Sequence, residues 1–163
     1  MNAMPFPTKA ALVVTFAVTA AALAAYIATR SDPVDTGDAA PYLCVLSGLF
    51  LLRVAGQLLV RLRPPRWLPP TEQWNLSPYH LLLPAQLAIL GLMAWIDTDF
   101  ARAGGFWTDP RPTLGTAVLW FAVVYAAVML VRYLMPASRT IPIVFHWVLA
   151  GYLYVFGSFH ASH

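Results

Sequence analysis

Five apolar stretches of about 20 residues dominate this sequence, and that is the length a helix needs to cross a lipid bilayer. A bilayer core about 30 Å thick is crossed by roughly 20 helical residues that rise 1.5 Å each. The expected spans are residues 10–29, 42–60, 79–96, 113–135 and 141–159. Prolines or charged residues bound each stretch, and both resist continuation of a membrane helix. The sequence therefore predicts one all-α domain over residues 1–163, a five-helix transmembrane bundle.

A water-soluble fold does not fit the composition of the chain. Of its 163 residues, 60% are hydrophobic and only 10% are charged, whereas soluble domains contain about 45–50% apolar and about 25% charged residues. The net charge of +3 comes from basic residues scattered singly among apolar runs, so they form no basic patch for nucleic acid. The single cysteine, Cys44, excludes a disulfide framework within one chain. The composition indicates a multi-pass integral membrane protein that contacts the lipid bilayer and binds no nucleic acid.

The first apolar stretch has two interpretations. Lys9 precedes it, and small residues such as Ala22 and Ala24 lie near its end, as in a cleaved signal peptide. The apolar core of a signal peptide, however, has only about 7–15 residues. The greater length of residues 10–29 favours a retained membrane anchor.

The distribution of basic residues predicts the orientation, because cytoplasmic loops carry an excess of Lys and Arg. With the N-terminus inside, the cytoplasmic side holds more basic residues than the outer side: Lys9, Arg61, Arg63, Arg66, Arg132 and Arg139 against Arg30, Arg102 and Arg111. We therefore expect a cytoplasmic N-terminus, and five spans then place the C-terminus outside. The expected location is an inner or plasma membrane of the bacterial type.

The connection between the second and third expected spans, residues 61–78, is rich in proline. Its prolines make it stiff, and Trp67 and Trp74 give it the amphipathic character of a segment at the headgroup interface. It also holds Glu72, the one acidic residue on the predicted cytoplasmic side. We expect Glu72 to fold back and pair with Arg53 or Arg132, because an unpaired charge within the membrane is costly.

Polar side chains from four expected spans gather at one depth, in the predicted cytoplasmic half. Arg53 lies about 12 Å from the inner boundary, and Gln57 follows one turn later on the same face. The other members of this layer are Gln86, Arg132, Tyr133 and His146, with Tyr125 somewhat deeper. One interpretation is structural: Arg53 snorkels, and the other groups are interhelical hydrogen-bond partners. The other is a site for a ligand or a partner protein.

Histidines suggest two further alternatives. His146 and His160 return to nearly the same helix face about 21 Å apart. This spacing resembles the axial histidine pairs of the cytochrome b family, and the resemblance implies haem b bound through His146, with Met129 as a possible second ligand. The resemblance covers one helix, and the chain offers no second histidine pair. At the other end, His160 and His163 with nearby aspartates are candidate metal ligands, although a frayed tail and solvated loops also account for them.

No nucleophile, metal-ligand or phosphate-loop motif appears in the chain, which favours a non-catalytic role. Because the longest connection has about 18 residues and no soluble domain is attached, the sequence predicts an accessory or structural subunit of a larger membrane complex, or a homo-oligomer. The alternative is a lipid- or quinone-handling membrane enzyme or carrier that uses the inner polar layer. A haem b electron carrier is the third hypothesis.

Overall fold

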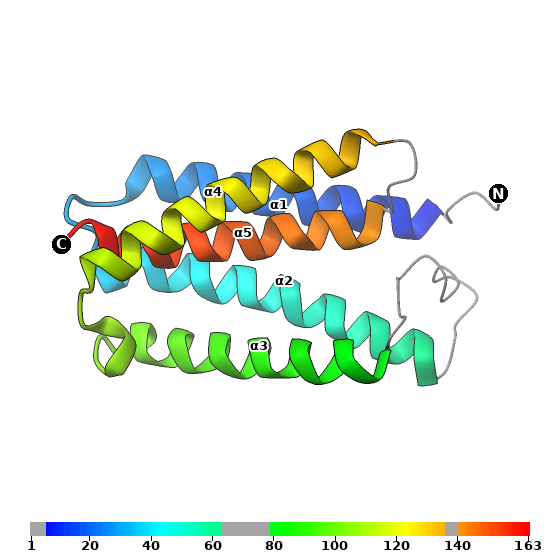
Figure 1. Cartoon of the computed structure of the whole chain (residues 1–163), viewed down its shortest axis with the longest axis horizontal. Coiled ribbons are helices and arrows are strands. Elements are labelled where there is room, and N and C mark those ends of the chain that lie inside the picture. The colour runs from blue at the N-terminus through cyan, green and yellow to red at the C-terminus, as the bar shows by residue number, and fades with distance from the viewer. Residues whose placement is uncertain (1–5, 63–78, 136–139) are drawn as a thin grey trace.

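The computed structural model describes residues 6–62, 79–135 and 140–163. These residues form α1 (Phe6–Thr29), α2 (Thr36–Leu62), α3 (Tyr79–Ala101), the short 3₁₀ helix η2 (Phe106–Thr108), α4 (Pro112–Leu134) and α5 (Thr140–Ala161). This part of the chain contains no strand. The five α-helices run along one long axis, and the two termini lie at opposite ends of the bundle (Figure 1). The predicted all-α bundle of five helices is confirmed.

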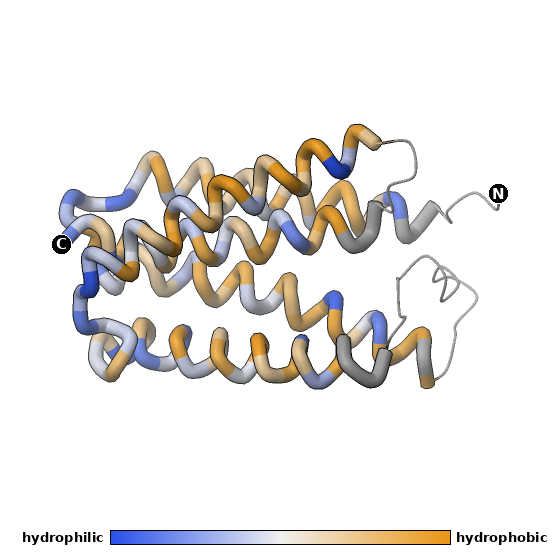
Figure 2. Tube along the Cα trace, viewed as in Figure 1, coloured by the Kyte–Doolittle hydropathy of each residue, from blue (hydrophilic) through white to orange (hydrophobic). Residues whose placement is uncertain are grey.

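Four of these helices are long and apolar enough to cross a membrane, over Lys9–Thr29, Thr36–Val60, Pro112–Leu134 and Ile143–Ala161. Figure 2 shows that these helices are largely hydrophobic. The hydrophilic segments are the connections at the end of the bundle where the C-terminus lies. The chain is therefore a multi-pass membrane protein. Helix α3, the predicted third span, is not among these four, which were sought only within the described residues. A fifth crossing by α3 stays a prediction, as does the orientation.

Most helix ends differ from those predicted, and three of the differences change where polar residues or a proline lie. Helix α2 begins at Thr36 rather than at Tyr42 and includes Pro41; the proline lies in the second turn, where it removes only one backbone hydrogen bond. Helix α3 continues to Ala101, so Asp97 and Asp99 lie on the helix and not in an outer loop. Helix α5 continues to Ala161, so the prediction of a frayed tail at His160 is wrong.

Helix α5 lies at the centre of the bundle. It packs against α1, α2 and α4, whereas α3 packs against α2. Its buried side chains Val148, Tyr152, Val155, Phe156 and Phe159 form a large part of the core. Figure 1 shows α5 between α4 and α2. These two helices therefore flank α5 and can share a site with it.

Helices α4 and α5 approach most closely at two glycines, Gly115 and Gly157. A Cβ atom added to Gly115 would lie 2.7 Å from the Cβ of His160, and one added to Gly157 would lie 3.0 Å from the backbone nitrogen of Leu119. The separation at Gly115 is shorter than real Cβ contacts, and the one at Gly157 is tighter than nine in ten of them. Small residues at such crossings let membrane helices pack backbone to backbone.

Asp99, near the C-terminal end of α3, organises the connection to α4. Its Oδ2 accepts a hydrogen bond from the backbone N–H of Trp107 (3.1 Å), and its carbonyl oxygen accepts one from Gly104 (3.1 Å). Gly105 has a φ of 127° and packs directly against the carboxylate, where a Cβ would overlap it. The turn therefore needs both the acid and the glycine.

We expect Asp99→Ala to lower the free energy of unfolding by about 1.5–3 kcal/mol, because the N–H of Trp107 loses a charged acceptor. Thermal unfolding in detergent, followed by circular dichroism, measures the change. The matched control is Asp109→Ala, an exposed aspartate next to the same turn, with an expected change within about 0.5 kcal/mol. Equal effects of the two substitutions would contradict the role assigned to Asp99.

Candidate functional site

Helix α2 carries two buried polar side chains in the half of the bundle that holds the N-terminus. Arg53 is only 6% exposed and Gln57 only 1%. They lie one helical turn apart, so they share a face of α2. This face packs in the bundle rather than against lipid, as expected for polar groups in a membrane protein.

One buried nitrogen atom in each of these two side chains lacks a hydrogen-bond acceptor among the described residues. The guanidinium carbon of Arg53 lies 5.6 Å from the centroid of the Phe145 ring, a cation–π contact. Within the described ranges, neither Nε of Arg53 nor Nε2 of Gln57 has a hydrogen-bond partner. Buried N–H groups are almost always paired, so these two unpaired groups indicate a missing acceptor.

Tyr125 of α4 and His146 of α5 form a hydrogen bond between the tyrosine hydroxyl and Nδ1 of the imidazole. Their rings meet edge to face, with centroids 5.6 Å apart. Arg53 lies close enough for its charge to act on both groups. This pair therefore joins α4 and α5 to the polar face of α2.

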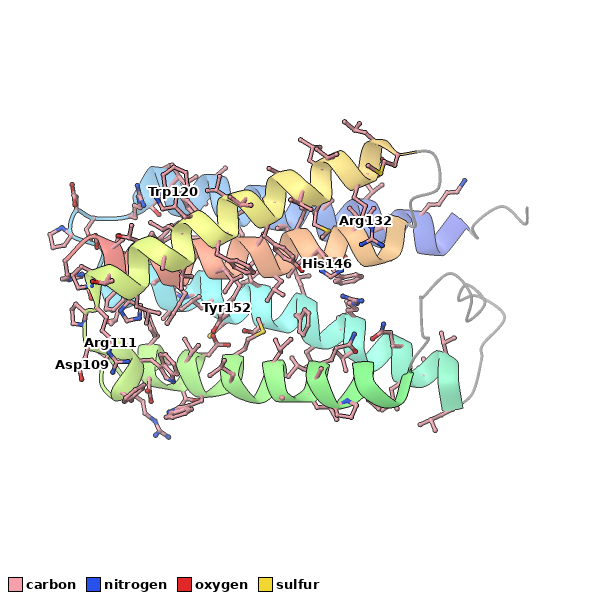
Figure 3. All side chains as sticks on the ribbon, viewed as in Figure 1. Asp109, Arg111, Trp120, Arg132, His146 and Tyr152 are labelled. Carbon is pink, nitrogen blue, oxygen red and sulfur yellow. The ribbon has the colours of Figure 1, made fainter. Side chains whose placement is uncertain are left out.

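Arg132 completes the cluster from α4. It lies two turns beyond Tyr125 on the same face of the helix. Figure 3 shows Arg132 and His146 together in the half of the bundle that holds the N-terminus, while Asp109 and Arg111 lie at the other end. We refer to Arg53, Gln57, Tyr125, Arg132 and His146 as the polar site.

The polar site brings together four of the seven residues that the sequence singled out. These are Arg53, Gln57, Arg132 and His146, from three helices. Gln86 is buried on α3, a helix that packs against α2. Tyr133 is half-exposed and packs against Trp147, with ring centroids 5.9 Å apart. Glu72 and the proline-rich connection lie outside the described residues, so the pairing of Glu72 with Arg53 or Arg132 stays a prediction.

Sequence reasoning placed Tyr125 near this layer but did not count it as a candidate, although its position two turns before Arg132 is the signal that identifies it. Asp97 was considered only as one of the aspartates near the candidate metal ligands His160 and His163, and not as a partner of Tyr152. Its Oδ1 accepts a hydrogen bond from the Tyr152 hydroxyl (3.1 Å), and Ser47 of α2 lies beside the pair. The only sequence signal for Asp97 was its position directly after the predicted span.

The histidines at the C-terminal end form no metal centre in the part of the chain that the structure describes. There, no group of three or more His, Cys, Asp or Glu side chains is placed to hold a metal ion. The ring of His160 is fully buried, packs on Phe156 and Phe159 with centroids 4.6 and 5.1 Å away, and has no hydrogen-bond partner among these residues. His163 is exposed. The alternative of haem b at His146 stays a prediction, and Tyr125 leaves only Nε2 for such a bond.

A groove lies on the other flank of α4, away from the polar site. It has a volume of about 490 Å³ and lies between α1 and α4, with α5 as its floor. Small residues shape it, among them Ala20, Ala126 and Gly151. Its lining is almost entirely apolar, so it offers contact to a hydrocarbon but no polar selectivity.

Removal of the Tyr125 hydroxyl tests the geometry of the polar site. We expect Tyr125→Phe to lower the free energy of unfolding by about 0.6–1.7 kcal/mol, the range of interhelical hydrogen bonds in membranes. Thermal unfolding in detergent checks this value. The control is Tyr154→Phe, whose hydroxyl makes no hydrogen bond to a described residue. If both substitutions left stability unchanged, the Tyr125–His146 bond would be absent from the folded protein.

Comparisons of the chain with protein-family models, with curated proteins and with solved structures found no match. The fold and the site define the class: a multi-pass helical membrane protein with a buried, cationic polar site in one half of its bundle.

Proposed function

We propose that the protein is a lipid- or quinone-handling membrane protein that binds the polar head of an amphiphile at the polar site. The observation that carries this proposal is the burial of Arg53 and Gln57, in which Nε of the arginine and Nε2 of the glutamine lack acceptors among the described residues. An arginine within a membrane span costs about 2.5–3.5 kcal/mol on insertion scales. A bound head group with oxygen acceptors offsets that cost.

The surroundings of the polar site suit a molecule that arrives through the membrane. Phe121 is exposed and stacks on Tyr125, with ring centroids 5.6 Å apart. Val128 on the same helix is exposed as well. These apolar side chains offer a path for a hydrocarbon tail beside a polar head, and the exposed Arg132 stands at the edge of the site. With the predicted orientation, the site opens to the cytoplasmic leaflet.

The role predicted from the sequence, an accessory subunit of a larger complex or a homo-oligomer, is compatible with amphiphile binding. Many membrane subunits hold lipids between their helices and a partner. The polar site supplies no specific observation for a partner protein, so this role stays a prediction.

Ligand-dependent stability tests the proposed function. Purified protein is stripped of lipid in detergent, and its thermal unfolding is recorded with and without a mixed lipid extract that contains quinones. Because a ligand at a hundred times its Kd stabilises the folded state by about 2.7 kcal/mol, we expect a clear rise in Tm for the wild type. The control variant is Arg102→Met, because Arg102 is an exposed arginine at the other end of the bundle. We expect the same rise in Tm for this control and no rise for Arg53→Met. An equal rise in all three proteins would contradict the proposal.

A further inference from the structure

We infer that the group bound at the polar site is a phosphate, carried by an anionic lipid head group or present as free phosphate. This inference rests on the proposed function and narrows its ligand class. It follows from the kinds of atoms that the site leaves unpaired, from the balance of charge around them, and from the hydrogen bond that already exists within the site.

The unpaired atoms of the polar site are donors. Nε of Arg53 and Nε2 of Gln57 are buried and lack partners within the described ranges. A guanidinium carries five N–H donors and no acceptor, and the amide nitrogen of glutamine carries two more. Arg132 adds a second guanidinium from α4. A fitting ligand therefore presents several acceptor oxygens, as a phosphate does.

The charge around the site is positive. The described residues form no ion pair that involves Arg53 or Arg132. The aspartates of the chain lie toward the opposite end of the bundle, on or beside the connections near the C-terminus: Asp32, Asp35, Asp38, Asp97, Asp99 and Asp109. A neutral quinone carbonyl leaves two guanidinium charges uncompensated, whereas a phosphate with one or two negative charges balances them.

The Tyr125–His146 pair supplies one more donor to the same space. When the tyrosine hydroxyl donates to Nδ1, the proton of the neutral imidazole resides on Nε2. The ring then offers Nε2–H in the polar site, and the hydrogen bond fixes its orientation. Three helices thus contribute donors around one anion: Arg53 and Gln57 from α2, Arg132 from α4 and His146 from α5.

The test compares probes that differ in the phosphate alone. Lipid-stripped protein in detergent is titrated with phosphatidic acid, with diacylglycerol of the same acyl chains, with ubiquinone and with inorganic phosphate, and the rise in Tm gives an apparent affinity. We expect phosphatidic acid to bind at least tenfold more tightly than diacylglycerol. If inorganic phosphate alone gives the full rise, the source is free phosphate; if only phosphatidic acid does, the source is a lipid.

Variants connect this binding to the site. Arg53→Met and Arg132→Met are each expected to weaken phosphatidic acid binding at least tenfold, and Arg102→Met is expected to leave it unchanged. Because Arg132 is exposed, its substitution tests the inference even if the Arg53 variant fails to fold. Glu72→Gln is expected to leave the affinity for phosphatidic acid unchanged. If the wild type bound no phosphate and Glu72→Gln did, Glu72 would occupy the site in the wild type, and the inference would be overturned.

The remaining outcomes separate this inference from the proposed function. Diacylglycerol or ubiquinone could bind as tightly as phosphatidic acid and in a way that depends on Arg53. That result would overturn the phosphate assignment and leave amphiphile binding in place. If no probe raised the Tm in a way that depends on Arg53 or Arg132, both the inference and the proposed function would fail.

Discussion

Gly115→Leu is expected to separate α4 from α5 and to lower the free energy of unfolding by about 3 kcal/mol. The Cβ of any residue at this position would lie 2.6 Å from the backbone carbon of His160, so the clash is with backbone rather than with a flexible side chain. Among the described residues, helix α4 packs mainly on α5, so this contact is the main one that holds it in place. Thermal unfolding in detergent, with helicity as the signal, measures the loss.

The matched control for this substitution is Gly48→Leu. Gly48 is exposed on α2, and a Cβ there meets nothing within 4 Å. Because glycine is a poor helix former, by about 1 kcal/mol relative to alanine, we expect this variant to be as stable as the wild type or more stable. A neutral Gly115→Leu, or equal losses at the two glycines, would mean that α4 and α5 do not cross at Gly115.

Arg53→Met is expected to raise the free energy of unfolding of the lipid-stripped protein by about 1–3 kcal/mol while abolishing the stabilisation that the ligand provides. Replacement of a buried ion pair by apolar residues of similar volume is often stabilising by about 1–4 kcal/mol, and we expect removal of a buried charge without a paired partner to act in the same direction. The loss of the cation–π contact with Phe145 reduces this gain. A substitution that stabilises the lipid-stripped protein but removes the stabilisation by the ligand is typical of a residue that is kept for binding at some expense of stability.

The same two measurements distinguish a purely structural Arg53. Unfolding of the variant is recorded once without lipid and once with saturating phosphatidic acid, beside Arg102→Met as the control. If the lipid-stripped variant were less stable than the wild type, Arg53 would already be paired in the folded protein. Repeating the measurement in a Glu72→Gln background would then show whether Glu72 is that partner.

The helices were largely predictable from hydropathy, but their ends were not. Hydropathy windows stop at charged residues, so the third span was expected to end before Asp97. The helix continues because neighbours satisfy the two acids: Tyr152 donates to Asp97, and the N–H of Trp107 donates to Asp99. Tyr152 lies 55 residues from Asp97 in sequence, and Trp107 lies 8 residues from Asp99 beyond the end of the helix. Neither contact leaves a signal in the hydropathy of the helix itself. The same holds for His160, whose burial depends on the packing of α5.

The depth of the polar site in the membrane was predictable from the sequence, but the rotation of each helix about its axis was not. A rise of 1.5 Å per residue placed Arg53, Arg132 and His146 at one level before any contact was known. Which side chains of α4 join them depends on how that helix is turned about its axis. Tyr125 and Arg132 share a face, whereas Tyr133 lies about 100° further around and packs on Trp147. That rotation is set by Gly115 and the buried Ala122 and Met129 against α5, which only tertiary packing reveals.

The most direct test of the central claim is native mass spectrometry of the protein extracted in mild detergent from its own membranes. Wild-type protein is expected to carry a reproducible additional mass that matches a phosphate-bearing lipid, or free phosphate, and that is retained by Arg102→Met. Arg53→Met and Arg132→Met are expected to lose it. A wild type that carries no small molecule, or an additional mass that both site variants retain, would contradict amphiphile binding at the polar site.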